Sequence, residues 1–169
     1  MNRLATATAV LAVAAGGVVA TAAPASADDR TCRGTISKQT ISGDLVVPSG
    51  ASCRVNSLDV KGNIKIGRGA TLRSYHSSVD GNIQSSGHRS VALGYNTIDG
   101  NIQLKSGGSM SIRKNTVDGD IQVFSNKSGA KNIYDNRVDG NLQCKSNSPA
   151  PKGARNKVKG NKEDQCRRF

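Results

Sequence analysis

Residues 79–84 have the sequence VDGNIQ, and close copies follow at residues 98–103 (IDGNIQ), 117–122 (VDGDIQ) and 138–143 (VDGNLQ). Partial copies flank these four at residues 41–45, 60–64 and 158–161. The seven central glycines lie at positions 43, 62, 81, 100, 119, 140 and 160. The spacing is therefore 19 to 21 residues throughout. A repeat this short is typical of a solenoid, in which each repeat is one coil that packs on its neighbours.

Apolar residues recur at fixed distances from each glycine. They stand two residues before it (Val79), two and four after it (Ile102 and Leu104), and seven and nine before it (Leu93 and Val91). Apolar and polar positions alternate there, as in a half-buried strand, and β-branched residues predominate. No window has the 3.6-residue period of a helix, and the L-x-x-L-x-L core of a leucine-rich repeat is absent.

We therefore predict an all-β fold, a right-handed parallel β-helix of about seven coils of 19–21 residues over residues 28–169. Equivalent residues should stack in columns about 4.8 Å apart, which makes a rod about 30–35 Å long. We expect each Gly-Asn or Gly-Asp step to turn a corner. The glycine would supply a positive φ there, and the next side chain would bond its own backbone.

Two columns of amide side chains are expected to point outward and stabilise the stack by hydrogen bonding along each column. They are Gln84, Gln103, Gln122 and Gln143, and Asn96, Asn115, Asn136 and Asn156.

The four cysteines agree with a coil of this length. Cys32 and Cys53 are 21 residues apart, and Cys144 and Cys166 are 22 apart, so each pair falls on adjacent coils. Adjacent coils are within disulfide reach, whereas the other pairings would span most of the stack. We predict Cys32–Cys53 and Cys144–Cys166, one bridge at each end of the rod.

The N-terminal 27 residues have the features of a secretory signal peptide. Arg3 is followed by an uncharged, Ala-rich run over residues 4–23, and Ala25-Ser26-Ala27 is a small-residue cleavage site. We expect cleavage after Ala27 rather than a retained membrane anchor, and hence a secreted protein, extracellular or associated with the cell wall. An even number of cysteines in a secreted chain is consistent with two disulfides.

Residues 136–144 (NRVDGNLQC) and 156–166 (NKVKGNKEDQC) resemble the end of small secreted repeat proteins of actinobacteria, a mostly uncharacterised group. The resemblance implies a secreted Gram-positive protein and supplies no activity. At the level of the fold, the short repeat is also similar to bactofilins, which form polymers. The signal peptide, the cysteines and the polar last coil depart from the bactofilin pattern.

Composition and charge point to a basic, aromatic-poor protein. The chain of 169 residues has no Trp, two Phe and three Tyr, and 24 Lys and Arg against 12 Asp and Glu. Residues 145–169 alone contain eight basic and two acidic residues. A basic surface outside a bacterial cell would meet teichoic acid, acidic glycan or extracellular DNA. A basic surface that serves only solubility is the alternative.

Candidate binding residues lie beside the strand that precedes each corner. Arginine forks and tyrosine rings suit sugar rings and phosphate-bearing polymers, although Tyr also favours strands for its own sake. The set is Arg54, Arg73, Tyr75, Tyr95, Arg113 and Tyr134, with Lys152, Arg155, Lys157 and Lys159 from the basic last coil.

A column of acids, Asp80, Asp99, Asp118 and Asp139, should repel itself unless cations or neighbouring basic residues offset it. No EF-hand loop or G-G-x-G-x-D motif is present, so we expect a turn column without metal. Catalysis has little support, because both histidines lie outside the repeat columns and all four cysteines are expected to be paired.

The sequence thus predicts a monomeric, non-catalytic binding protein of the cell envelope, with no cofactor and no stable membrane anchor. Its expected partner is an anionic cell-wall polymer or acidic glycan, and it would bind nucleic acid only through non-specific charge. A self-assembling structural surface protein is the alternative, and a small polysaccharide-acting enzyme is a third reading.

Overall fold

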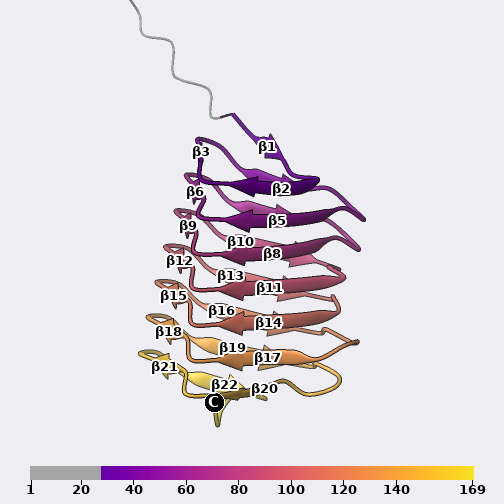
Figure 1. The fold of residues 1–169 in the computed structure, drawn as a ribbon. Coiled ribbons are helices and arrows are strands. Elements are labelled where there is room, and N and C mark those ends of the chain that lie inside the picture. The colour runs from indigo at the N-terminus through magenta and orange to yellow at the C-terminus, as the bar shows by residue number, and fades with distance from the viewer. Residues whose placement is uncertain (1–27) are drawn as a thin grey trace, which may run out of the picture.

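The computed structural model describes residues 28–169, which form a solenoid of about seven coils (Figure 1). The predicted signal peptide lies outside the described residues. Each coil contributes one strand to each of three parallel sheets. The described residues contain no helix, and thus none long and apolar enough to cross a membrane.

Sheet A consists of β1 (Arg30–Thr31), β4 (Leu45–Val47), β7 (Ile64–Ile66), β10 (Ile83–Ser86), β13 (Ile102–Lys105), β16 (Ile121–Phe124), β19 (Leu142–Lys145) and β22 (Lys162–Asp164). Sheet B consists of β2 (Gly34–Ser37), β5 (Ser52–Asn56), β8 (Thr71–Tyr75), β11 (Ser90–Gly94), β14 (Ser109–Arg113), β17 (Lys131–Tyr134) and β20 (Lys152–Ala154). Sheet C consists of β3 (Thr40–Ile41), β6 (Asp59–Val60), β9 (Ser78–Val79), β12 (Thr97–Ile98), β15 (Thr116–Val117), β18 (Arg137–Val138) and β21 (Lys157–Val158).

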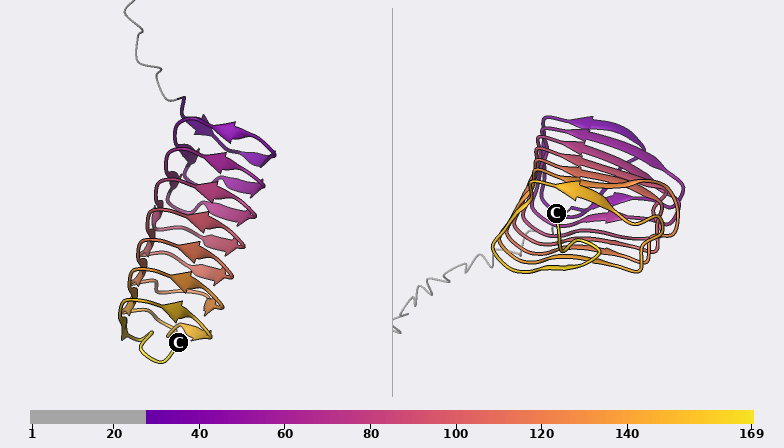
Figure 2. Two further views of the ribbon diagram at one scale, coloured as in Figure 1. Left: turned by 90° about the vertical axis from the view of Figure 1, so that its left-hand side faces the viewer. Right: turned by 90° about the horizontal axis from the view of Figure 1, so that it is seen from below.

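Each strand pairs with the equivalent strand of the next coil (Figure 2). Residues one repeat apart in the sequence therefore stack in columns. In sheet A, Ile83 lies opposite Ile64 on one side and Ile102 on the other. The inward positions of all three sheets enclose one continuous core of aliphatic side chains. Burial of these Val, Ile and Leu columns takes the place of the aromatic core that the sequence lacks.

Some polar residues occupy core positions, and Ser85 and Lys131 find hydrogen-bond partners there. Ser85 Oγ donates to the carbonyl of Ile66 at 2.9 Å. Lys131 stacks on Met110 and is 1% exposed. Its ammonium donates to the carbonyls of Ser128, Gly129 and Ser148 at 2.8–3.0 Å. Burial lowers the pKa of Lys131, and the three carbonyls replace the water that its ammonium has lost.

Both predicted disulfides are confirmed. Cys32–Cys53 joins the first two coils, with a Cα–Cα distance of 5.6 Å, and Cys144–Cys166 joins the last two, with a distance of 5.3 Å. The bridges therefore hold the two ends of the solenoid, where the terminal coils have a neighbour on one side only. Two disulfides indicate an oxidising compartment.

The prediction that the repeat glycines supply a positive φ at the corners is wrong. Positive φ values occur at Gly34, Gly50, Gly69, Gly87 and Gly129, and at none of the repeat glycines. The repeat glycines instead lie directly against the preceding coil. A Cβ atom at Gly100 would lie 2.6 Å from the carbonyl oxygen of Gly81. Close stacking of the corners therefore excludes a side chain at this position.

The residue after each repeat glycine bonds the next coil rather than its own backbone, contrary to the prediction. Asn63 Oδ1 accepts the backbone N–H of Asn82 at 2.9 Å, and Asn82 Oδ1 accepts that of Asn101 at 2.8 Å. The same contact joins Asn101 to Asp120 and Asp120 to Asn141. This ladder ties each corner to the following one, which explains why the position accepts Asn or Asp.

The second predicted outward column, Asn96 to Asn156, points inward. Asn96, Asn115, Asn136 and Asn156 are 1–4% exposed. Asn115 Nδ2 donates to Asn136 Oδ1 and to the carbonyl of Leu93, while Asn115 Oδ1 accepts from Asn96. The residue before each of them adopts a positive φ, as at Tyr95 (58°) and Lys114 (56°). The positive φ interrupts the alternation of inward and outward side chains, so the asparagine that follows points inward. The prediction of an outward column is therefore wrong.

Candidate functional site

Sheet B, whose strands face the viewer in Figure 1, carries arginine and tyrosine residues at outward positions. Arg54 on β5 lies opposite Arg73 on β8, and both are exposed. In the neighbouring column Tyr75 is followed by Gly94, Arg113 and Tyr134. The structure therefore brings together the six candidates named from the sequence, with Tyr95 at the corner directly after β11.

Basic residues predominate on sheet B, whereas the charges on sheet C nearly balance. We define the sheet B face as the outward residues of its strands together with the corner residue that follows each strand. It carries one acid, Asp135, and seven basic residues: Lys38, Arg54, Arg73, Arg113, Lys114, Lys152 and Arg155. Sheet C, taken in the same way, carries five acids against four basic residues. An anion that approaches the molecule is thus attracted to sheet B.

Most of the basic residues on the sheet B face remain available to a ligand. Within residues 28–169, Arg155 alone of the seven makes an ion pair, to Asp135 with N–O distances of 2.6 and 2.9 Å. Arg155 lowers the pKa of Asp135 by hydrogen bonding to its carboxylate. Arg54 and Arg73 have no acidic partner in the described part of the chain. Because they lie opposite each other in one column, their positive charges repel.

Aromatic rings and cations contact one another along the same face. Arg113 lies over the ring of Tyr134, with its guanidinium carbon 4.6 Å from the ring centroid. Lys114 Nζ donates to the Tyr95 hydroxyl at 3.0 Å, which raises the pKa of Lys114. His76 stacks on Tyr95 with the ring centroids 5.0 Å apart. These contacts position the rings of Tyr95 and Tyr134. Tyr75 and Tyr95 are 39% and 50% exposed.

Two shallow hollows mark the face. One, of about 540 Å³, lies over Arg54, Arg73, Tyr75 and His76. The other, of about 290 Å³, lies around Gly94, between Tyr95, Arg113 and Lys114. The ring of Tyr75 lies over Gly94, and a Cβ atom at position 94 would lie 2.7 Å from that ring. The packing of Tyr75 therefore leaves no room for a side chain at this position. The hollows offer ring faces and cationic groups, without the depth of an enclosed pocket.

The basic last coil divides between two faces. Lys152 continues the column of Arg54 and Arg73, and Arg155 is the last corner residue of sheet B. Lys157 and Lys159 belong to the sheet C side, where Lys159 pairs with Asp139 at 2.6 Å. The hydrogen bond from Lys159 lowers the pKa of Asp139. The structure therefore does not bring Lys157 and Lys159 together with the arginines of sheet B.

The acidic column on sheet C ends in ion pairs. Lys61 contacts Asp80 at 3.5 Å and Asp59 at 3.0 Å, while Asp139 is held by Arg137 and Lys159. Basic residues thus offset the two outer acids of the column. Among residues 28–169, no cluster of three or more His, Cys, Asp and Glu side chains is placed to hold a metal ion.

The two histidines have unlike surroundings. His76 is an exposed corner residue, whereas His88 is 2% exposed, with no hydrogen-bond partner for either ring nitrogen among the described residues. Burial, aided by the nearby Lys131 charge, lowers the pKa of His88 from 6.5 to about 4. At neutral pH this imidazole is therefore uncharged. Its ring occupies the space over Gly107, where a side chain would collide with it.

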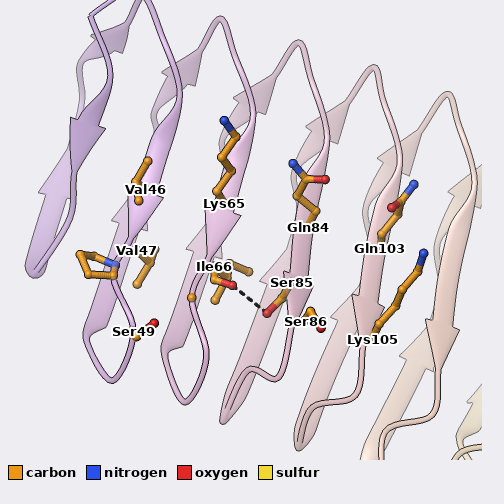
Figure 3. Close-up of a pocket in the computed structure, with 12 residues that line it drawn as sticks. Val46, Val47, Ser49, Lys65, Ile66, Gln84, Ser85, Ser86, Gln103 and Lys105 are labelled. Carbon is orange, nitrogen blue, oxygen red and sulfur yellow. Dashed lines mark hydrogen bonds between the residues drawn. The ribbon is translucent and has the colours of Figure 1, made fainter.

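Sequence reasoning missed a hollow on the outward face of sheet A. It has a volume of about 520 Å³ and lies over β4, β7, β10 and β13 (Figure 3). The predicted Gln column supplies Gln84 and Gln103 to its wall. The interpretation of that column as purely structural overlooked the small residues beside it, Gly67 and Ser86, which were the available signal.

Comparisons with protein-family models, with curated proteins and with solved structures give no match to this chain.

Proposed function

We propose that the protein is a non-catalytic, secreted binding protein of the cell envelope whose sheet B face holds an anionic polymer. One observation supports this above the others: seven basic residues and one acid share this face, while acids outnumber basic residues on sheet C. Residues placed only for solubility would be expected to mix both signs over the surface.

The geometry of the face suits a linear polymer. Successive coils lie about 4.8 Å apart, so Arg54 and Arg73 stand one coil apart in a column that also contains Lys152, four coils further on. Arg54 and Arg73 stand in one column and repel each other, and a polymer of phosphates or carboxylates would relieve that repulsion. Guanidinium groups bind such anions through paired hydrogen bonds, and the exposed Tyr75 and Tyr95 rings offer flat surfaces to sugars.

The test is retention of the oxidised protein, residues 28–169, on purified Gram-positive cell wall with and without teichoic acid, at two salt concentrations. We expect retention that needs the teichoic acid and is lost at high salt, because attraction between exposed charges is screened. Retention unchanged by salt, or by removal of teichoic acid, would contradict the proposal.

A matched pair of double variants locates the site. Arg54→Ala with Arg73→Ala removes two stacked cations from sheet B, and Arg137→Ala with Lys157→Ala removes two stacked cations from sheet C. With soluble teichoic acid, the sheet B variant should lower the slope of log affinity against log salt by about two, as for other linear polyanions. The sheet C variant should leave the slope nearly unchanged. Equal effects would show that charge acts without a specific face.

A further inference from the structure

The hollow on sheet A is a groove with an apolar floor and a polar wall. The column Pro48, Gly67, Ser86 has short side chains or none, and it lies beside the longer column Lys65, Gln84, Gln103. Figure 3 shows Lys65, Gln84 and Gln103 projecting in succession from neighbouring coils, with Lys105 at one end. Val46 and Pro48 add half-exposed apolar surface at the other end. A groove of about 520 Å³ is within the range of small-ligand sites.

The glutamines that line the groove differ from those beyond it in the same column. Gln122 Nε2 donates to Gln143 at 3.0 Å, and Gln143 Nε2 donates to Glu163 at 2.9 Å. Within residues 28–169, the side chains of Gln84 and Gln103 make no hydrogen bond. Each free amide offers two N–H donors and one carbonyl acceptor. The amide ladder is thus closed beyond the groove and open inside it.

The charges of the groove are also uneven. Lys65 forms an ion pair with Asp44, which raises the pKa of Lys65 and lowers that of Asp44. Lys105 has no acidic partner among the described residues, and its ammonium lies 5.7 Å from the centroid of the Phe124 ring. The middle of the groove therefore presents the neutral amides of Gln84 and Gln103, and its end presents the unpaired positive charge of Lys105.

We propose that this groove binds a linear oligosaccharide that contains acidic sugars. The amides of Gln84 and Gln103 bond sugar hydroxyls, the apolar faces of the rings lie on Val46 and Pro48, and Lys105 binds a carboxylate. The inference does not rest on the proposed function, because the groove is on a different sheet and shares no residue with the sheet B face.

The test uses the side-chain amide signals of the ¹⁵N-labelled protein in heteronuclear NMR, with hexagalacturonate as the acidic probe and cellohexaose as the neutral one. We expect the Gln84 and Gln103 signals to shift saturably with hexagalacturonate. Gln122 and Gln143, which share the column but are already paired, serve as internal controls and should not move. The absence of a shift at Gln84 and Gln103, or an equal shift of all four signals, would overturn the proposal.

Variants separate this groove from sheet B. Ser86→Tyr fills the groove and should abolish the shifts, whereas Thr97→Tyr on sheet C and the Arg54→Ala, Arg73→Ala double variant should leave them intact. Lys105→Gln should weaken hexagalacturonate binding about tenfold, as expected for the loss of a charged hydrogen bond. Shifts that persist in Ser86→Tyr would overturn the site. Equal binding of cellohexaose would overturn the role given to Lys105.

Discussion

Asn115 Nδ2 donates a hydrogen bond of 3.0 Å to Asn136 Oδ1 inside the solenoid, one coil further along. The same Nδ2 donates to the carbonyl of Leu93, and the same side chain accepts from Asn96. The contact is one step of a ladder that satisfies the backbone where sheet B passes into sheet C. Because these side chains are buried, a lost bond can leave a polar group without a partner.

Asn115→Ala should lower the free energy of unfolding by about 3 kcal/mol, since the buried backbone N–H of Asn96 and the buried carbonyl of Leu93 both lose the Asn115 side chain as a partner. Urea denaturation measures the change. Asn161→Ala is the matched control, because Asn161 is exposed and ends the corner ladder. It should cost much less. Similar losses in both variants would show that the interior ladder has no special weight.

Gly100→Ala should destabilise the protein by about 2 kcal/mol, because the new Cβ atom would lie 2.6 Å from the carbonyl oxygen of Gly81 and force the coils apart. The φ of Gly100 is not positive, so the effect comes from crowding alone. Asp99→Ala, at the adjacent exposed position, provides the comparison in thermal unfolding. A melting temperature for Gly100→Ala at or above that of the parent would refute the crowding argument.

Acid should destabilise the protein through His88. Its pKa is about 4 in the folded chain and near 6.5 in the unfolded chain. Between these values the unfolded chain binds a proton that the folded chain does not, so stability falls as the pH drops from 6.5 to 4. The full loss is about 3 kcal/mol. Urea denaturation from pH 7 to pH 4 follows it.

His88→Asn should remove this part of the pH dependence, because asparagine does not titrate. Asparagine should also fit the position, since residue 88 shares its corner column with Asn126 and Asn147, whose side chains form hydrogen bonds along the column. His76→Asn, at an exposed corner, should retain it. Acid sensitivity that survives in His88→Asn would assign the effect to carboxylates such as Asp44, Asp135 and Asp139.

Cys144→Ser with Cys166→Ser should lower the free energy of unfolding by about 3 kcal/mol, because the bridge closes a loop of about one coil and restricts the unfolded chain. The loss should be greatest in the last coil, which packs on a neighbour on one side only. Hydrogen exchange of the β20 and β22 amides, compared with those of β13, resolves the position. Uniform acceleration in all three strands would indicate that the bridge acts on the whole solenoid.

Much of the architecture could be predicted from the repeat. The 19–21-residue spacing of Gly81 and its equivalents indicated one coil per repeat, and the spacing of the cysteines indicated which pairs meet. Both predictions succeed because a solenoid places residues one repeat apart in direct contact, so separation along the chain translates into distance. The outward positions of Arg54, Arg73, Tyr75, Arg113 and Tyr134 follow from the alternation within a strand. Tyr95 does not, because it lies at the corner after β11.

The corners and the faces depended on tertiary structure. A positive φ at Tyr95 and Lys114 interrupts the alternation, so Asn96 and Asn115 turn inward although the strand pattern predicts them outward. The geometry of the corners places Arg54 and Arg73 on a different face from Lys157 and Lys159. It also forms the groove beside Gln84. A repeat determines which residues stack along the rod. The angles between its sheets, set by side chains packed across the core and by bonds between coils, determine which columns share a surface.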